Sequence, residues 1–335
     1  MKIGYRLYLL CLVICCWTAG KGVGQNTGKR PLAFEEFFHG KMERISGVLP
    51  VYRDSAKVYM EIPECLLGRE LEIRAQVNKG FDMVARPLES MGVVYLQKVD
   101  DHSIYIQRRL FSERVVNKNN ELYEALCKSN KQPVDIVYPV VAYSADGMGY
   151  MIDVTEMLKT GDDWFKVAAP QVRDQDVSRA RITGVHEFSD GVSFTIHRMY
   201  GFSPERLLDN VIPPRGFLPL EIGCVVTLLP ERDMRERFAD RRFGYHVISF
   251  LDYSQNYRAE KDSIIRKWNL GITKDSRGEY RKGKLVNPSH PLVFYIDTCC
   301  PSEFVPYIKE GVLAWNAAFE KAGFKNALRV KMADS

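Results

Sequence analysis

Hydrophobic residues between positions 47 and 251 mostly alternate with polar ones, which is typical of β-strands with one buried face. Short polar turns separate these runs, so neighbouring runs should pair as antiparallel hairpins. The clearest hairpin is predicted at the turn Ser189, Asp190 and Gly191. Short helices are predicted at Glu121–Lys128 and Asp153–Lys159. The predicted strands are Gly47–Tyr52, Lys57–Ile62, Glu70–Val77, Gly92–Val99, Ser103–Leu110, Val134–Tyr143, Tyr150–Val154, Ile182–Phe188, Val192–Met199, Leu218–Leu229 and Phe243–Leu251.

The pattern changes after residue 290. Leu292–Ile296 is an uninterrupted apolar run of strand length, which is typical of a strand buried on both faces. A helix should follow, because apolar residues recur three or four positions apart at Ile308, Val312, Trp315, Phe319 and Ala322. Gly323 should end this helix in the left-handed conformation, and Leu328–Met332 alternates as a second strand. One such crossover unit cannot cover both faces of its own sheet, so large apolar side chains are expected to stay exposed.

Residues 1–25 are predicted to be a signal peptide. Lys2 and Arg6 precede the apolar run Leu7–Trp17, which is too short to span a bilayer. Small residues follow, and cleavage is expected between Ala19 and Gln25. The protein is therefore expected to be secreted or periplasmic, with no stable membrane span after cleavage.

Charge and cysteine content narrow the function classes. The chain has 47 Lys and Arg and 42 Asp and Glu, and their interspersed distribution does not favour a nucleic-acid partner. The cysteines after the signal are odd in number and lack a CxxC pair, so neither a disulfide framework nor a zinc site is predicted. We expect Cys65, Cys127 and Cys224 to be buried packing thiols, and the adjacent Cys299 and Cys300 to lie in a loop.

The sequence offers no catalytic, cofactor-binding or metal-binding residue that can be assigned from a motif. His186-Glu187 begins like the zinc motif HExxH, but Asp190 stands where the second histidine is needed. Met234–His246 (MRERFADRRFGYH) is dense in charged and aromatic residues. We interpret it as a solvated loop; the alternative is a segment that docks against a neighbouring domain and presents Asp240 or an arginine to it.

Several stretches resemble the large secreted bacterial zinc-dependent metalloproteases, in which two poorly characterised β-rich domains precede a metzincin-like catalytic domain. The resembling stretches are Gly47–Glu70 (GVLPVYRDSAKVYMEIPECLLGRE), Tyr150–Thr155, Asp240–Tyr245, Asp252-Tyr253, Val293–Asp297 and Gly311–Ala327 (GVLAWNAAFEKAGFKNA). The resemblance covers roughly residues 40–332. It implies an α+β fold: mostly antiparallel β N-terminal domains, followed by the first β-α-β unit of a metzincin-like α/β catalytic domain.

The domain order that follows is 1–25 signal peptide, 26–115 β-rich N-terminal domain, 116–287 second β-rich domain with short helices, and 288–335 the start of the catalytic domain. Lys274–Lys284 is interpreted as a linker or exposed loop before the last boundary. The sequence would then end inside the catalytic domain.

The resemblance also implies a peptidase whose zinc sits on HExxHxxGxxH, with the glutamate activating the zinc-bound water. This sequence contains no such motif, so no zinc ligand is carried over. We expect this chain alone to hold no cofactor and to be inactive, and a complete family member to hold zinc. One hypothesis is thus the N-terminal, non-catalytic portion of a metallopeptidase, which meets a protein or peptide substrate only when the catalytic domain is supplied. The other is a stand-alone secreted β-rich binding protein; whether the chain is part of an enzyme stays open.

Overall fold

The structure is a computed structural model that describes residues 30–80, 89–115, 119, 121–129, 133–161, 164–165, 172–202, 217–231, 234–240, 242–254 and 259–333. The chain divides into two compact units. Unit 1 comprises Met1–Asp233 and Leu251–Glu260, and unit 2 comprises Met234–Phe250 and Lys261–Ser335. The predicted signal peptide lies outside the described residues. No helix among the described residues is long and apolar enough to cross a membrane.

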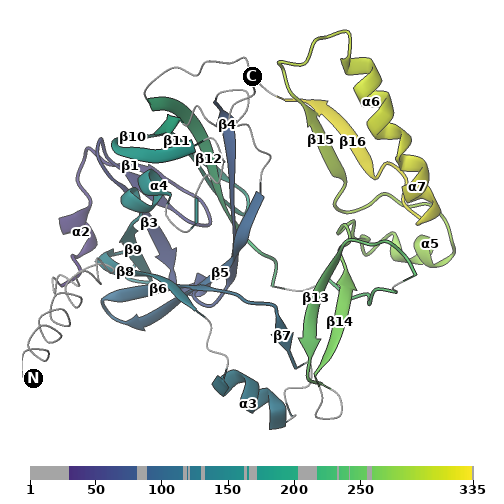
Figure 1. Cartoon of the computed structure of the whole chain (residues 1–335), viewed down its shortest axis with the longest axis horizontal. Helices are drawn as coiled ribbons and strands as arrows, with labels where there is room; N and C mark the ends of the chain where they lie inside the picture. The colour runs from purple at the N-terminus through teal and green to yellow at the C-terminus, as the bar shows by residue number, and fades with distance from the viewer. Residues whose placement is uncertain are drawn as a thin grey trace, which may run out of the picture. The chain divides into compact units, whose positions relative to one another are not determined.

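Unit 1 is built on one antiparallel sheet, in which eleven strands are described, ordered β1-β2-β3-β9-β8-β6-β5-β4-β12-β11-β10. Strands β1 and β10, at the two ends of this order, also contact each other, so the sheet nearly closes on itself (Figure 1). The strands are β1 (Glu43–Ile45), β2 (Val51–Arg53), β3 (Val58–Pro63), β4 (Glu70–Lys79), β5 (Glu89–Asp100), β6 (Ser103–Arg108), β8 (Val134–Tyr143), β9 (Gly149–Asp153), β10 (Val172–Phe188), β11 (Gly191–Phe202) and β12 (Phe217–Leu228). The antiparallel β structure predicted from alternation is confirmed.

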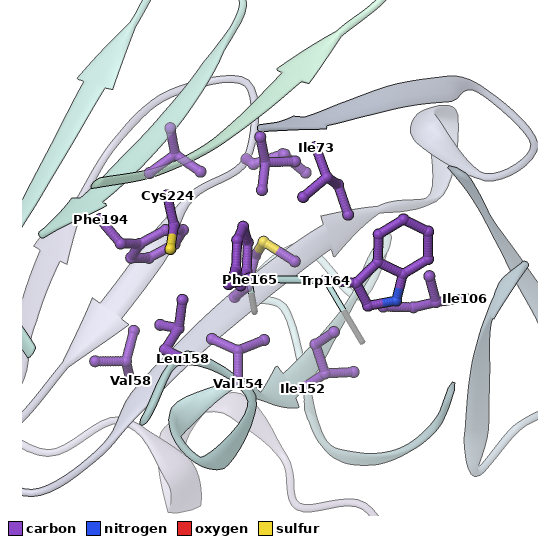
Figure 2. Packing of buried hydrophobic residues seen from close by; sticks show 14 of the residues in the cluster. Val58, Ile73, Ile106, Ile152, Val154, Leu158, Trp164, Phe165, Phe194 and Cys224 are labelled. Carbon is purple, nitrogen blue, oxygen red and sulfur yellow. The ribbon is translucent and has the colours of Figure 1, made fainter. Parts of the chain in front are cut away.

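The core of unit 1 lies inside this curved sheet. Along β4 every second side chain from Leu71 to Val77 is buried, as period-two alternation requires. Trp164 and Phe165, both fully buried, fill the interior between the strands. Figure 2 shows them among side chains from strands far apart in the sequence, such as Ile73, Ile106 and Phe194. The boundary placed at residues 115 and 116 falls inside this sheet, because β1–β6 precede it and β8–β12 follow it.

Local signals fix several turns and helix ends. Asp54 Oδ1 accepts hydrogen bonds from the backbone N–H groups of Ala56 (2.7 Å) and Lys57 (2.8 Å), which closes the predicted β2–β3 hairpin. Helix α4 (Thr155–Thr160) ends at Gly161, whose φ of 68° is left-handed. The predicted hairpin forms between β10 and β11, with Ser189 and Asp190 in the turn; Gly191, which was predicted to belong to the turn, is the first residue of β11.

The fully buried Arg198 holds the C-terminal end of α4. Its guanidinium donates from Nε (3.1 Å) and Nη2 (2.5 Å) to the carbonyl of Leu158, and from Nη1 (2.6 Å) to that of Phe165. Both carbonyls belong to fully buried residues, and the last carbonyls of a helix carry partial negative charge. The charge on Arg198 is thus accommodated in the core because it caps a helix.

The remaining described elements of unit 1 lie outside the eleven-stranded sheet. Aromatic side chains of helix α2 (Phe34–Phe37) pack against Tyr52 and Tyr59 in a second, smaller apolar cluster. Helix α3 (Glu121–Ser129) forms where predicted. The short strand β7 (Glu113–Arg114) pairs in parallel with Leu251 and Asp252 of β13.

Unit 2 contains most of β14 (Glu260–Ile265) and the first part of β13 (Val247–Asp252); Glu260 and the last two residues of β13 belong to unit 1. Helix α5 (Arg277–Arg281) and a β-α-β segment follow. That segment runs through β15 (Leu292–Ile296), α6 (Val305–Ala314), α7 (Asn316–Lys321) and β16 (Leu328–Met332). β15 and β16 pair in parallel. Helix α5 corrects the interpretation of Lys274–Lys284 as a loop, because a hydrogen-bonded turn forms despite the glycine at 278.

The prediction that β15 is buried on both faces is wrong. Ile296 is buried, but Phe294 is 45% and Tyr295 60% exposed. The physical reason is that the sheet contains two described strands with described helices against one face, which leaves too few elements to cover its apolar side chains.

Candidate functional site

The most distinctive surface of unit 2 lies between its C-terminal helices and the β15–β16 pair. Helix α6 has Pro306 in its first turn and ends before Trp315, and helix α7 begins directly after this residue. Gly323 (φ 93°) ends α7 in the left-handed conformation, and the N–H of Phe324 returns to the carbonyl of Phe319 at 3.0 Å. The predicted helix and its glycine stop are confirmed, with a break at Trp315 that the pattern did not predict.

Asn316 attaches the helices to the sheet. Its Oδ1 accepts the backbone N–H of Leu328 at 2.9 Å, and its Nδ2 donates to the carbonyl of the same residue at 3.2 Å. Below this contact a small core forms from Leu270, Val286, Phe324 and Ala327, with Leu292 and Phe319 packed against it. The spacing between helix and sheet is therefore set at one end by a specific hydrogen-bonded pair and a packed cluster.

Beside this attachment an open hollow of about 470 Å³ remains, which we call the apolar groove. It is lined by Trp268, Leu292, Phe294, Ile308, Gly311, Val312, Trp315, Phe319 and Leu328. Trp268 and Trp315 are 64% and 68% exposed, so the two largest lining side chains are mostly in contact with solvent. A second hollow of about 350 Å³ shares Trp315 and adds Ala314, Ala317, Ala318 and Lys321.

The lining determines what the apolar groove can do. None of the described residues that line it is titratable, so these side chains supply neither a nucleophile nor a general acid or base. The groove offers aromatic and aliphatic area for another apolar surface. Of its nine lining residues, Ile308, Val312, Trp315 and Phe319 come from the predicted helix stripe. Trp268 was missed by the sequence analysis, because it lies in a segment without periodicity.

Asp297 follows β15 at the carboxyl end of the strand. Its Oδ1 accepts the backbone N–H of Cys299 at 2.7 Å. This hydrogen bond, reinforced by one from the Cys299 side chain, holds the pKa of the Asp297 carboxyl below its ordinary value. Cys299 and Cys300 lie in the turn that follows, so their interpretation as loop thiols is confirmed.

Of the other cysteine predictions, the one for Cys224 is confirmed and the one for Cys65 is wrong. Cys224 is fully buried, and burial raises the pKa of its thiol to about 12, so it is a neutral packing group at physiological pH. Cys65 is exposed, so its prediction as a buried thiol is wrong: it lies in the single turn Glu64–Leu66, where Leu66 takes the inward position. The side chain of Cys127 lies outside the described residues.

The histidine candidates are not brought together by the β10–β11 hairpin. His186 lies opposite Ser193, whereas His197 lies opposite Arg181. His197 Nε2 is instead 3.1 Å from Glu221 Oε2 on β12. Among the residues that the structure describes, no cluster of three or more His, Cys, Asp or Glu side chains has the arrangement to hold a metal ion.

Most of the described part of Met234–His246 is exposed, in agreement with its interpretation as a solvated loop. Asp240 accepts hydrogen bonds from the Arg242 guanidinium, at 3.0 Å between Nε and Oδ1, which lowers the pKa of the Asp240 carboxyl. Phe238 forms a β-bridge with Ile264, so part of the segment is anchored to β14. Its role as a docking segment stays a prediction.

Two regions of the chain match known protein families. The family described as Domain of unknown function (DUF5117) matches residues 88–273, and that described as Domain of unknown function (DUF5118) matches residues 31–71. No curated protein and no solved structure matches the chain significantly. Apart from Trp268, the residues that line the apolar groove lie outside both matched regions.

Proposed function

The chain belongs to the family described as Domain of unknown function (DUF5117), which covers more than half of it, and we propose that it is the non-catalytic portion of a secreted zinc-dependent metallopeptidase. On this proposal unit 1 is a β-rich accessory region, and the β15–β16 segment is the first layer of a metzincin-like catalytic domain. The chain would be inactive until the remainder of that domain is supplied, in the same polypeptide or by another chain.

One observation carries the proposal. A parallel strand pair and its crossover helices border an open groove whose described lining is apolar, next to a small packed core. Each large side chain left in water forgoes about 1.5–3 kcal/mol of burial free energy. Such an arrangement suits an unfinished interface better than a ligand site, because a small-molecule site needs convergent polar groups for orientation.

The proposal commits to one occupant of the groove, a segment of the catalytic domain with an apolar face that also carries HExxHxxGxxH. The resemblance of Val293–Asp297 and Gly311–Ala327 to the opening of such a domain supports this choice. The zinc and its general base would come from that segment, and the apolar groove would hold it in place. The substrate would be a protein or peptide, and a signal peptide at residues 1–25 would place the enzyme outside the cytoplasm.

The test compares the chain alone with a form that includes the adjacent coding sequence. Zinc content is measured by plasma mass spectrometry, and cleavage is measured on labelled casein. We expect neither zinc nor cleavage for the chain alone, and one zinc with cleavage for a longer form that contains HExxHxxGxxH. Stoichiometric zinc and proteolysis by the chain alone would overturn the proposal. The proposal would also be overturned if HExxHxxGxxH were absent both from the adjacent coding sequence and from every chain that copurifies with this one. The hypothesis of a stand-alone binding protein would then explain the observations better.

A further inference from the structure

Basic residues concentrate in unit 2. Its sequence contains 17 Lys and Arg against 10 Asp and Glu, a net charge of +7, whereas the whole chain carries +5. The excess of positive charge in the protein therefore lies entirely in this unit. The two matched regions and the peptidase resemblance do not account for that asymmetry.

Part of the excess forms a cluster from two segments far apart in the sequence, which we call the basic patch. All six of its side chains are exposed. Its members are Arg277, Arg281, Lys282, Lys284, Lys321 and Lys325. None of them lines the apolar groove.

Aromatic packing and hydrogen bonds between the two segments hold them together. The Tyr280 ring lies 5.4 Å from that of Phe324, and its hydroxyl donates to the carbonyl of Ala322 at 3.1 Å. The N–H of Val286 donates to the carbonyl of Gly323 at 3.0 Å, and that of Lys325 donates back to Val286 at 2.9 Å. The backbone positions of the six cations are therefore fixed by a packed frame, although their side chains extend into solvent.

The charges of the basic patch are mostly unpaired. Lys284 Nζ lies 3.6 Å from Glu279 Oε1. The other five cations have no ion pair with a described carboxylate, although Asp275 and Glu320 are close in sequence. Like charges held near one another repel, and a partner with several negative charges removes that repulsion. The arrangement favours a polyanion rather than a single small anion.

We propose that the basic patch binds an acidic segment of a partner polypeptide. The Tyr280 ring is packed against Phe324 and half-buried, so it offers little face on which a sugar can stack, and the exposed Trp315 shares a hollow with Lys321 alone of the six cations. Exposed Leu285 adjoins the patch, but one aliphatic side chain gives little area for insertion into a bilayer. Four of the six cations are lysines, whose flexible point charges can pair with the carboxylates of an extended acidic chain, and the two arginines can each bind a carboxylate with both arms of the guanidinium.

The experiment measures binding of fluorescent poly-L-glutamate to the full chain by anisotropy. The test variant is K282Q/K284Q/K321Q/K325Q, and the control variant K261Q/K309Q/R329Q/K331Q removes the same charge from other exposed positions of unit 2. We expect the test variant to bind about tenfold more weakly and the control to change by less than about twofold. Binding of the unmodified chain should also weaken by about tenfold between about 50 and 200 mM salt.

Equal losses in the two variants would overturn the proposal, because net charge alone would then explain binding. It would also fail if the unmodified chain bound dextran sulfate or phosphatidylglycerol vesicles through these lysines but did not bind poly-L-glutamate. Circular dichroism and thermal unfolding check that both variants fold. Because no residue of the groove is changed, the outcome is separable from that of the zinc and cleavage test.

Discussion

Replacement of Arg198 by methionine tests whether a buried charge in unit 1 serves as a structural helix cap. The substitution keeps a long side chain but removes three hydrogen bonds, so the carbonyls of Leu158 and Phe165 lose the donors that Arg198 provides. An unsatisfied buried carbonyl costs about 1–3 kcal/mol, and a hydrogen bond from a charged donor contributes about 1.5–3 kcal/mol. The variant no longer has to bury a guanidinium, which offsets part of this loss.

We therefore expect R198M to lose about 3–5 kcal/mol of unfolding free energy, a large part of the about 5–15 kcal/mol typical of a folded protein. Urea unfolding followed by tryptophan fluorescence measures this change. The control is R179Q, because Arg179 is 60% exposed and pairs with Asp176 at 3.1 Å. The control should shift by less than about 1 kcal/mol. An R198M protein within about 1 kcal/mol of the unmodified chain would refute the helix-cap reasoning.

Three further predictions concern other parts of the chain. Trp315→Ala should lower the unfolding free energy of this chain by less than about 1 kcal/mol, since the side chain is 68% exposed, and by about 3–5 kcal/mol in a form with the apolar groove filled. Urea unfolding of both forms measures the difference, and a large loss of stability in this chain alone would contradict the prediction. Hydrogen bonds from the backbone N–H groups of Ala56 and Lys57 lower the pKa of Asp54, so the stability that its carboxylate contributes is complete above the ordinary carboxyl pKa of about 4 and is lost as the pH falls through the lowered pKa. Asp54→Ala should destabilise the chain by about 1 kcal/mol at pH 7, and its difference from the unmodified chain should shrink as urea unfolding is repeated at lower pH; a difference that does not change with pH would be inconsistent. Ellman's reagent at pH 8 should label Cys65 and Cys299 rapidly and Cys224 only after unfolding, as peptide mass mapping can determine; rapid labelling of Cys224 would argue against its burial.

The local structure followed from the sequence because its causes are local. Alternation along Glu70–Val77 and the turn at Ser189 and Asp190 specify a strand and a hairpin without reference to the rest of the chain. Gly161 and Gly323 end their helices because each adopts the left-handed conformation that glycine tolerates. These features depend on neighbours within a few residues.

The arrangement of the strands did not follow, because it depends on distant pairings. β3 pairs with β9, and β4 pairs with β12, across separations that no periodicity encodes. The role of Arg198 was also hidden, since an arginine in a strand predicts a solvent-facing position unless a buried acceptor is known. For the apolar groove, the helix stripe gave four lining residues, but the position of Trp268 requires the folded chain.

The near-closure of the unit 1 sheet has a consequence for how its two matched regions relate. Residues 31–71 supply β1–β3, and residues 88–273 supply β9, whose open side β3 covers. A polypeptide beginning at residue 88 would leave β9 with unpaired hydrogen-bonding groups, and it would also lack β4, which separates β5 from β12. The two regions should therefore fold together, as parts of a single folding unit rather than as interchangeable modules.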